Sequence, residues 1–253
     1  SGSNTLDGGS GADNLIGGDG NDTLNGGDAA DTLYAGNGDD TVNAGNGDDL
    51  VIGGDGAGND RYDGGTGIDT VKYTSAKAAI TVDLTNGSAT STAGNDVAGI
   101  GTDVLTNIEN VIAGNYNDTI IGSSSNNVLD GQAGADKLTG LGGADTFLFS
   151  TKSTFGLTTA DHVTDFKASE GDKIQINKAA FGIDVKATVS LQTITKSADL
   201  NAALGSTNLF VYDQSNGNLY WNQDGKTAGF GTGGIFAVLD NKAALTSSNI
   251  SLS

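Results

Sequence analysis

Aspartate is the residue of this sequence best placed to do chemistry, because it recurs at a fixed spacing. Asp13, Asp22, Asp31, Asp40 and Asp49 stand nine residues apart, each in a glycine-rich stretch. Carboxylate and backbone carbonyl oxygens are the ligands that hard divalent cations such as Ca²⁺ prefer. The net charge of -19, from 31 acidic and 12 basic residues, makes a compact chain repel itself unless cations neutralise it. The spacing and the charge together indicate bound metal.

The composition also excludes several classes of partner. A strongly acidic chain repels nucleic acid and anionic membrane surfaces. No apolar run approaches the roughly 20 residues that span a bilayer, so we expect no membrane insertion. There is no Cys for a disulfide or a thiolate metal site. The N-terminus shows no basic-then-apolar signal peptide, so we expect a cytosolic chain or one whose export signal lies elsewhere.

The aspartates belong to nine-residue units that repeat along the chain. Residues 8–72 read GGSGADNLI, GGDGNDTLN, GGDAADTLY, AGNGDDTVN, AGNGDDLVI, GGDGAGNDRYD and GGTGIDTVK, the sixth unit carrying a two-residue insertion. The register resumes in residues 113–148 with AGNYNDTII, GSSSNNVLD, GQAGADKLT and GLGGADTFL. These later units are more degenerate, since Asn127 replaces the repeated Asp.

Each unit predicts a six-residue turn followed by a three-residue strand with one inward side chain. Glycine permits the positive φ angles that such turns need. One apolar residue in nine cannot form a core alone, so the units must stack, strand upon strand about 4.8 Å apart. This predicts an all-β solenoid. The expected inward residues are Leu15, Leu24, Leu33, Val42, Val51, Tyr62, Val71, Ile120, Leu129, Leu138 and Phe147.

The GGxGxDxUx pattern resembles the repeat of the RTX, or haemolysin-type, calcium-binding proteins. The resemblance implies a right-handed parallel β-roll with two repeats per turn. It also implies a calcium ion between each loop and the loop two repeats later. The first loop would give the carbonyls of its second and fourth residues and its Asp; the later loop would give the carbonyls of its first and third residues and its Asp. About five ions are then expected in the first block.

The ligands implied by the resemblance are the residues at these loop positions. The first three sites would use Gly9, Gly11, Asp13, Gly26, Asp28 and Asp31, then Gly18, Gly20, Asp22, Ala35, Asn37 and Asp40, then Gly27, Ala29, Asp31, Ala44, Asn46 and Asp49. The fourth and fifth would use Gly36, Gly38, Asp40, Gly53, Asp55 and Asp60, and Gly45, Gly47, Asp49, Gly64, Thr66 and Asp69. The insertion before Asp60 leaves that ligand the least constrained by the pattern.

In the second block the resemblance implies fewer ligands. One site would use Gly114, Tyr116, Asp118, Gly131, Ala133 and Asp136. A second would combine Asn127 with Gly140, Gly142 and Asp145. Because Asn127 lacks a charge, we expect that second site to be weaker or empty.

We expect four regions: a first β-roll block (1–72), a β-helical insertion (73–112), a second β-roll block (113–148) and a C-terminal capping and secretion-signal region (149–253). Alternating apolar residues predict strands in the insertion. Similar insertions in the family form longer, metal-poor coils; a substrate-binding insertion is the alternative. The region from Asp145 resembles the segment that closes the β-roll in serralysin-type proteases and alginate epimerase modules. Within it, Asn216-Gly217 between apolar runs predicts a hairpin.

Residues 209–253 resemble the C-terminal targeting region of bacterial proteins exported by type I (ABC transporter) machinery. The resemblance implies a secreted or cell-surface chain, for instance part of a surface-layer protein or adhesin, with surface polysaccharide or self-assembly as possible partners. We expect it to be non-catalytic, because a lone His162 without a nucleophile motif is better explained as a capping residue. The alternatives are a C-terminal module of a secreted protease, lipase or epimerase, and a polysaccharide-binding module.

Overall fold

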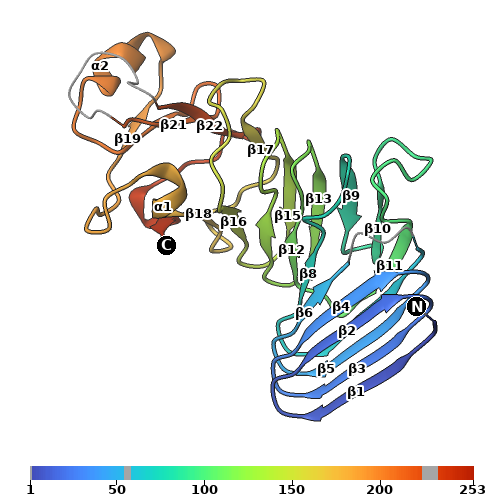
Figure 1. The fold of residues 1–253 in the computed structure, drawn as a ribbon. Coiled ribbons are helices and arrows are strands. Elements are labelled where there is room, and N and C mark those ends of the chain that lie inside the picture. Colours follow the sequence, from blue (N-terminus) through green and yellow to red (C-terminus); the bar gives the residue numbers. More distant parts are fainter. Residues whose placement is uncertain (1, 54–57, 224–232) are drawn as a thin grey trace.

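Two long β-sheets run side by side through the molecule, and the chain winds back and forth between them. The computed structural model describes residues 2–53, 58–223 and 233–253. Figure 1 shows the first block (blue) at one end and α2, β19 and β21 (orange and red) at the other. The expected all-β parallel β-roll is confirmed.

The two sheets can be followed strand by strand within the described residues. The larger sheet has the order β1 (Thr5–Ser10), β3 (Thr23–Asp28), β5 (Thr41–Asn46), β7 (Arg61–Thr66), β11 (Thr102–Thr106), β10 (Ser88–Ser91), β9 (Ile80–Asp83), β13 (Thr119–Ser123), β15 (Lys137–Leu141), β17 (Asp161–Val163), β22 (Gly234–Leu239), β21 (Asn218–Trp221), β20 (Phe210–Asp213) and β19 (Leu191–Ile194). The smaller has the order β2 (Asn14–Asp19), β4 (Thr32–Asn37), β6 (Leu50–Ile52), β8 (Thr70–Lys72), β12 (Asn110–Ile112), β14 (Val128–Asp130), β16 (Thr146–Phe149), β18 (Lys173–Ile176) and β23 (Ile250–Leu252).

One turn of the roll consists of two repeat units. In the first block, strands pair in parallel 18 residues apart, as Leu6 with Leu24 and Leu24 with Val42, and 20 residues apart across the two-residue insertion, as Val42 with Tyr62. In the other sheet Leu15 pairs with Leu33, and Leu33 with Val51. Stacked inward side chains therefore form one apolar column in each sheet. All the expected inward residues are fully buried except Leu15, which is partly buried near the N-terminal end.

The strands are longer than the three residues expected per unit. Most strands of the first block have six residues, because they continue through the first three positions of the next unit, as in β3. The ladder continues there: Gly9 pairs with Gly27, and Ser10 with Asp28. The glycines hence form part of the sheet, and the turn is confined to about the fourth to sixth positions of each unit.

The insertion continues both sheets but is not wholly parallel. β11 pairs in parallel with β7, and β12 in parallel with β8. β9 and β10, which lie between β8 and β11 in the chain, form an antiparallel pair, and β10 is also antiparallel to β11. The expected strands are present, but a hairpin stands where a longer parallel coil was anticipated.

The C-terminal region closes the roll with a different core. β20 and β21 form the hairpin predicted at Asn216-Gly217, and β21 continues antiparallel onto β22. Aromatic rings replace the aliphatic column here: Phe181 lies edge-on to Trp221 and to Phe236, with centroids 5.7 and 5.4 Å apart. The last strand, β23, pairs in parallel with β18. The described residues 209–223 and 233–253 are therefore part of the folded end of the molecule.

Helices are few and short in the described part of the chain. They are α1 (Lys178–Phe181), α2 (Leu200–Leu204) and the 3₁₀ turns η1 (Ser197–Asp199) and η2 (Ser247–Asn249). No helix in the described residues is long and apolar enough to cross a membrane. The sheets therefore determine the position of nearly every polar loop.

The apolar column gives a first testable expectation. Leu33→Ala should lower the free energy of unfolding by about 2–5 kcal/mol, because it leaves a cavity between Leu15 and Val51. Denaturant titration with calcium present measures this. Tyr34→Ala is the control, since the neighbouring side chain is 38% exposed on the outer face. Equal losses in the two variants would contradict the assigned inward position.

Candidate calcium sites

The repeated aspartates of alternate loops form a row in which each carboxylate accepts a hydrogen bond from the preceding coil. The Asp13 amide donates to Asp31 Oδ1 (2.8 Å), and the Asp31 amide to Asp49 Oδ1 (2.7 Å). The Asp49 amide continues the row by donating to Asp69 Oδ1 (2.8 Å). The register of the strands thus superimposes like charges. The carboxylates remain stacked because each ties its loop to the preceding one.

A second row follows the other set of loops and ends differently. The Asp22 amide donates to Asp40 Oδ1 (2.7 Å), and the Asp40 amide to Asp60 Oδ1 (2.8 Å). Asp60 therefore does align with Asp40 despite the insertion. Its other oxygen, Oδ2, accepts a hydrogen bond from the Tyr62 hydroxyl (2.7 Å). The next acid, Asp103, is likewise bonded by Tyr73 (2.7 Å). Tyrosine hydroxyls, not open space, face these two carboxylates.

Most repeat aspartates keep one oxygen buried and without a hydrogen-bond partner. These Oδ2 atoms belong to Asp13, Asp22, Asp31, Asp40, Asp49, Asp69 and Asp136. A buried anionic oxygen without a partner is costly. No Lys or Arg compensates: the ion pairs found within residues 2–53, 58–223 and 233–253 are His162–Asp240 and Lys167–Glu170. The unsatisfied oxygens are those expected of ligands to a cation.

Carbonyl oxygens of the later loop converge on these unsatisfied carboxylates. A methyl group built on Gly8 would lie 2.6 Å from the Gly26 carbonyl oxygen and 2.7 Å from Asp13 Oδ2. At Gly17 the corresponding distances are 2.4 Å to the Ala35 carbonyl oxygen and 2.7 Å to Asp22 Oδ2. Each pair of oxygens thus borders one small space. The Gly26 and Ala35 carbonyls therefore border the same spaces as Asp13 and Asp22 Oδ2, and their binding of calcium stays a prediction.

The second and fourth positions of each loop direct carbonyls toward the following coil. Gly9 and Gly11 have φ angles of 86° and 119°, and Ala29 adopts 78° although it carries a side chain. A methyl group on Gly27 would lie 2.0 Å from the Gly9 carbonyl oxygen. Glycine is favoured at such positions for both reasons. The loops therefore present carbonyl oxygens between successive coils.

In the first, second, third and fifth expected sites the two aspartates are joined by a backbone amide, and the third-position carbonyls of Asp28, Asn37 and Thr66 accept the amides of Gly11, Gly20 and Gly47. That these residues bind calcium stays a prediction. In the fourth, Asp55 lies outside the described residues, while Asp60 approaches Asp40 through the bond given above. Each expected site has two carboxylates, and in the described residues no three or more His, Cys, Asp or Glu side chains are grouped so that they could hold one metal ion by themselves. The donor set is therefore dominated by backbone oxygens, which suits Ca²⁺.

The electrostatics of the rows agree with a cation requirement. Burial, with smaller contributions from the charges of Asp60 and Asp22, raises the pKa of Asp40 to about 6, although a backbone hydrogen bond lowers it. Burial also raises the pKa of Asp69 to about 6, with Asp49 and Glu109 adding to it. Without a cation, these carboxylates resist ionisation in the folded chain.

The second block is less open than the first. The Asp118 amide donates to Asp136 Oδ1 (2.7 Å), so the row is continued. However, both oxygens of Asp118 accept backbone amides, from Ile80 (2.8 Å) and Gly114 (3.0 Å). The Gly114 carbonyl accepts the Ala133 amide (3.2 Å). The loop at Gly114 and Tyr116 is thus folded onto its own Asp, unlike the open loops of the first block.

Asn127 stabilises its loop without a charge. Its Oδ1 accepts the Ser123 amide (2.7 Å), and its Nδ2 donates to the Glu109 carbonyl (2.6 Å). The backbone amide of Asn127 donates to Asp145 Oδ1 (2.9 Å), and Asp145 lies beside Gly140. The Gly142 amide donates to the Ser123 carbonyl (3.1 Å). Internal hydrogen bonds therefore satisfy the Asn127 side chain.

Acids beyond the repeats also continue the rows, and the repeat pattern did not identify their role. Asp136 donates its amide to Asp161 Oδ1 (2.9 Å), and Asp145 donates to Asp172 Oδ1 (3.0 Å). Asp69 donates to Glu109 Oε2 (2.9 Å). In the chain, Asp69 and Glu109 each directly precede a short strand with a central valine. An acidic residue directly before such a strand is the sequence signal that could have identified Glu109.

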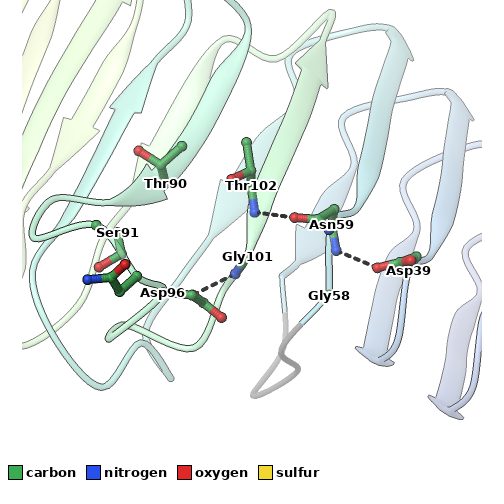
Figure 2. A pocket seen from close by; sticks show the side chains of 10 residues that line it. Asp39, Gly58, Asn59, Thr90, Ser91, Asp96, Gly101 and Thr102 are labelled. Atoms are coloured by element: carbon green, nitrogen blue, oxygen red, sulfur yellow. Dashed lines mark hydrogen bonds between the residues drawn. The ribbon is translucent and has the colours of Figure 1, made fainter.

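An open pocket of about 410 Å³ lies where the first block meets the insertion. Figure 2 shows its polar lining, in which the Asn59 amide donates to Asp39 and the Thr102 amide donates to Asn59. Asp96 similarly accepts the Gly101 amide (2.8 Å). No aromatic side chain is among the described residues that line it. The pocket lacks the apolar surface typical of small-molecule sites.

Solved structures and one family model are similar to parts of this chain. The chain resembles the solution structure of a subunit of the Azotobacter vinelandii mannuronan C5-epimerase (20% identity, 93% of this chain and 80% of that chain, TM-score 0.29). It also resembles an extracellular lipase from Serratia marcescens (19% identity, 96% of this chain, TM-score 0.30), of which it spans 40%. Among curated protein sequences no significant match was found. The model of the RTX calcium-binding nonapeptide repeat matches four times, at residues 1–33, 25–57, 56–71 and 112–147. Over these residues the chain consists of RTX calcium-binding nonapeptide repeats.

Proposed function

We propose that this chain is a calcium-dependent folding module of an extracellular or cell-surface protein exported by type I machinery, and that it is not itself catalytic. The observation that carries the proposal is the set of buried Asp Oδ2 atoms without partners in the first block. Calcium supplies positive charge and accepts several oxygen ligands at once. The chain's own contribution is to hold those oxygens at fixed positions between coils.

The magnitudes favour a cation as the decisive element. Two carboxylates about 4.8 Å apart repel by roughly 3 kcal/mol at an effective dielectric constant of about 20. Burying one Leu or Val side chain contributes about 1.5–3 kcal/mol. Each unit brings one such carboxylate and one such side chain, so the two effects nearly cancel. Stacking becomes favourable once the charge is neutralised.

The non-catalytic part of the proposal rests on the chemistry of the polar groups. The chain's single histidine, His162, lies on β17 with Nδ1 2.7 Å from Asp240 Oδ1, and both side chains are partly exposed. The repeat carboxylates are engaged with backbone amides across the coils. In the described part of the chain, no hydrogen bond joins His162 or a repeat carboxylate to a Ser or Thr hydroxyl, which supports a structural role.

Export follows from the calcium dependence together with the C-terminal region. Where free calcium is scarce, low-affinity sites (extracellular modules bind at roughly 10⁻⁴–10⁻³ M) stay empty, and the charged loops repel. The chain then remains extended, and without Cys no cross-link blocks a narrow channel. In the folded state β22 and β23 are paired to β17 and β18. A targeting segment in residues 209–253 would therefore be accessible only before folding.

Removal of calcium should unfold the first block. We expect EGTA to reduce the β-signal in circular dichroism and added Ca²⁺ to restore it, because metal binding and folding are coupled. Mg²⁺ is the control cation, since it is smaller and demands octahedral geometry. An identical spectrum in EGTA and in Ca²⁺ would refute the calcium dependence.

The two oxygens of one aspartate should serve two ions. Asp31 Oδ1 faces the Asp13 loop, whereas Oδ2 and the Ala44 carbonyl both approach Gly26. Asp31→Asn should therefore remove about two ions, and Asp13→Asn about one, as counted by native mass spectrometry at saturating Ca²⁺. Asparagine keeps the shape and removes the charge. Loss of the same number from both variants would show that the carboxylates are not shared.

Export should depend on the C-terminal strands and not on the length of the array. Deleting residues 233–253 is expected to abolish transfer to the medium by a type I exporter, because it removes the segment that resembles the targeting region. Calcium binding by residues 8–72 should persist in the truncated chain. Immunoblotting of cells and medium measures the export.

The matched control deletes residues 5–22, which is 18 residues and so one turn of the roll. This variant keeps the register and the C-terminal region, and it should still reach the medium. Export of the C-terminal truncation would overturn the targeting assignment and leave β22 and β23 as a cap of the roll alone.

A further inference from the structure

A glutamate from outside the repeats completes the row that begins at Asp13. Glu109 Oε2 accepts the Asp69 amide (2.9 Å), the bond that an Asp Oδ1 accepts at each earlier step. The Glu109 amide in turn donates to the Asp69 carbonyl (3.1 Å). Asn110, the next residue, pairs with Thr70. Glu109 therefore occupies the place of a repeat Asp in the coil that follows the first block.

Asn107, two residues before Glu109, lies at the first loop position of this coil. Thr106 pairs with Asp63, so Asn107 lies opposite Gly64. A methyl group on Gly64 would lie 2.1 Å from the Asn107 carbonyl oxygen and 2.6 Å from Asp69 Oδ2. At Gly26, within the repeats, the corresponding distances to a carbonyl and an Asp Oδ2 are 2.3 and 2.4 Å. The same small space bordered by oxygens is thus present beyond the last repeat.

The oxygen that points into this space is unsatisfied. Asp69 is 0% exposed, and its Oδ2 has no hydrogen-bond partner. Its other oxygen is used by the Asp49 amide. Gly65 and Gly67, at the second and fourth positions of the Asp69 loop, have φ angles of 93° and 142°. They adopt the conformation that directs carbonyls toward the following coil in the earlier repeats.

Resting on the proposed calcium function, we propose a further calcium site formed by Asp69, Glu109 and the backbone carbonyls of Asn107, Gly65 and Gly67. The repeat pattern does not encode it, since the matched residues end at 71 and resume at 112. The later loop is also shorter: two steps separate Asn107 from Glu109, whereas five separate Gly64 from Asp69.

The shortened loop explains why a glutamate is needed. With three residues fewer, the coil lacks the third-position carbonyl that a full repeat would give. The longer Glu side chain reaches from a tighter turn, and water can complete the six to eight oxygens that Ca²⁺ takes. The Glu109 carbonyl accepts Asn127 Nδ2 (2.6 Å), so the same residue joins the first block to the second. An ion here fixes the junction of the two blocks.

The only other glutamate of the chain provides a matched control. Glu109→Gln should bind one ion fewer than the unaltered protein at saturating Ca²⁺, whereas Glu170→Gln, in a partly exposed pair with Lys167, should bind the full number. Native mass spectrometry of the whole chain counts the ions, and circular dichroism confirms that each variant is folded. Asp13→Asn serves as a reference for the loss of one ion.

A full ion count in folded Glu109→Gln would overturn the inference while leaving the repeat sites in place. If the unaltered chain bound no calcium, the proposed function itself would fail, so the two failures are distinct. Anomalous diffraction from the calcium-saturated unaltered protein gives an answer that needs no variant. An anomalous peak between Glu109 and Asp69 supports the site, and the absence of an anomalous peak there contradicts it.

Discussion

Repulsion between stacked aspartates is the constraint on which the first block depends. The parallel register brings Asp31 beside Asp13 on one side and Asp49 on the other, and each step buries an oxygen that no group in the described chain satisfies. A thin column of Leu and Val cannot offset this by itself. Ions between the coils reverse the sign of the interaction, so the fold and the metal sites form one structure.

The loops show how a short repeat supplies enough ligands. Most donors are backbone carbonyls, whose direction is fixed by left-handed residues such as Gly9 and Gly11. Only one charged side chain per unit is then needed, and it can serve two neighbouring spaces. Where the glycines are lost, as at Tyr116, the loop closes on its own Asp118 through backbone amides. The difference between the two blocks is therefore one of backbone conformation as much as of charge.

The nine-residue repeat made much of the fold predictable from the sequence. A period of nine specified the inward residues and the strand register, and the resemblance specified two units per turn. The strand ends were not predictable, because glycines that permit turns also remain in the ladder, as Gly9 does with Gly27. The antiparallel β10 and the role of Glu109 lie outside the period. The role of Glu109 depends on its contact with Asp69, 40 residues earlier in the chain, which no local pattern records.

We expect calcium to stabilise the aspartate rows of the first block more than the aromatic core at the C-terminal end. Hydrogen–deuterium exchange of the whole chain, measured peptide by peptide in saturating Ca²⁺ and in EGTA, tests it directly. The account predicts that β3, β5 and β7 lose protection in EGTA, while β20 and β21, packed with Trp221, retain most of theirs. Equal protection of β3, β5 and β7 with and without calcium would contradict the account.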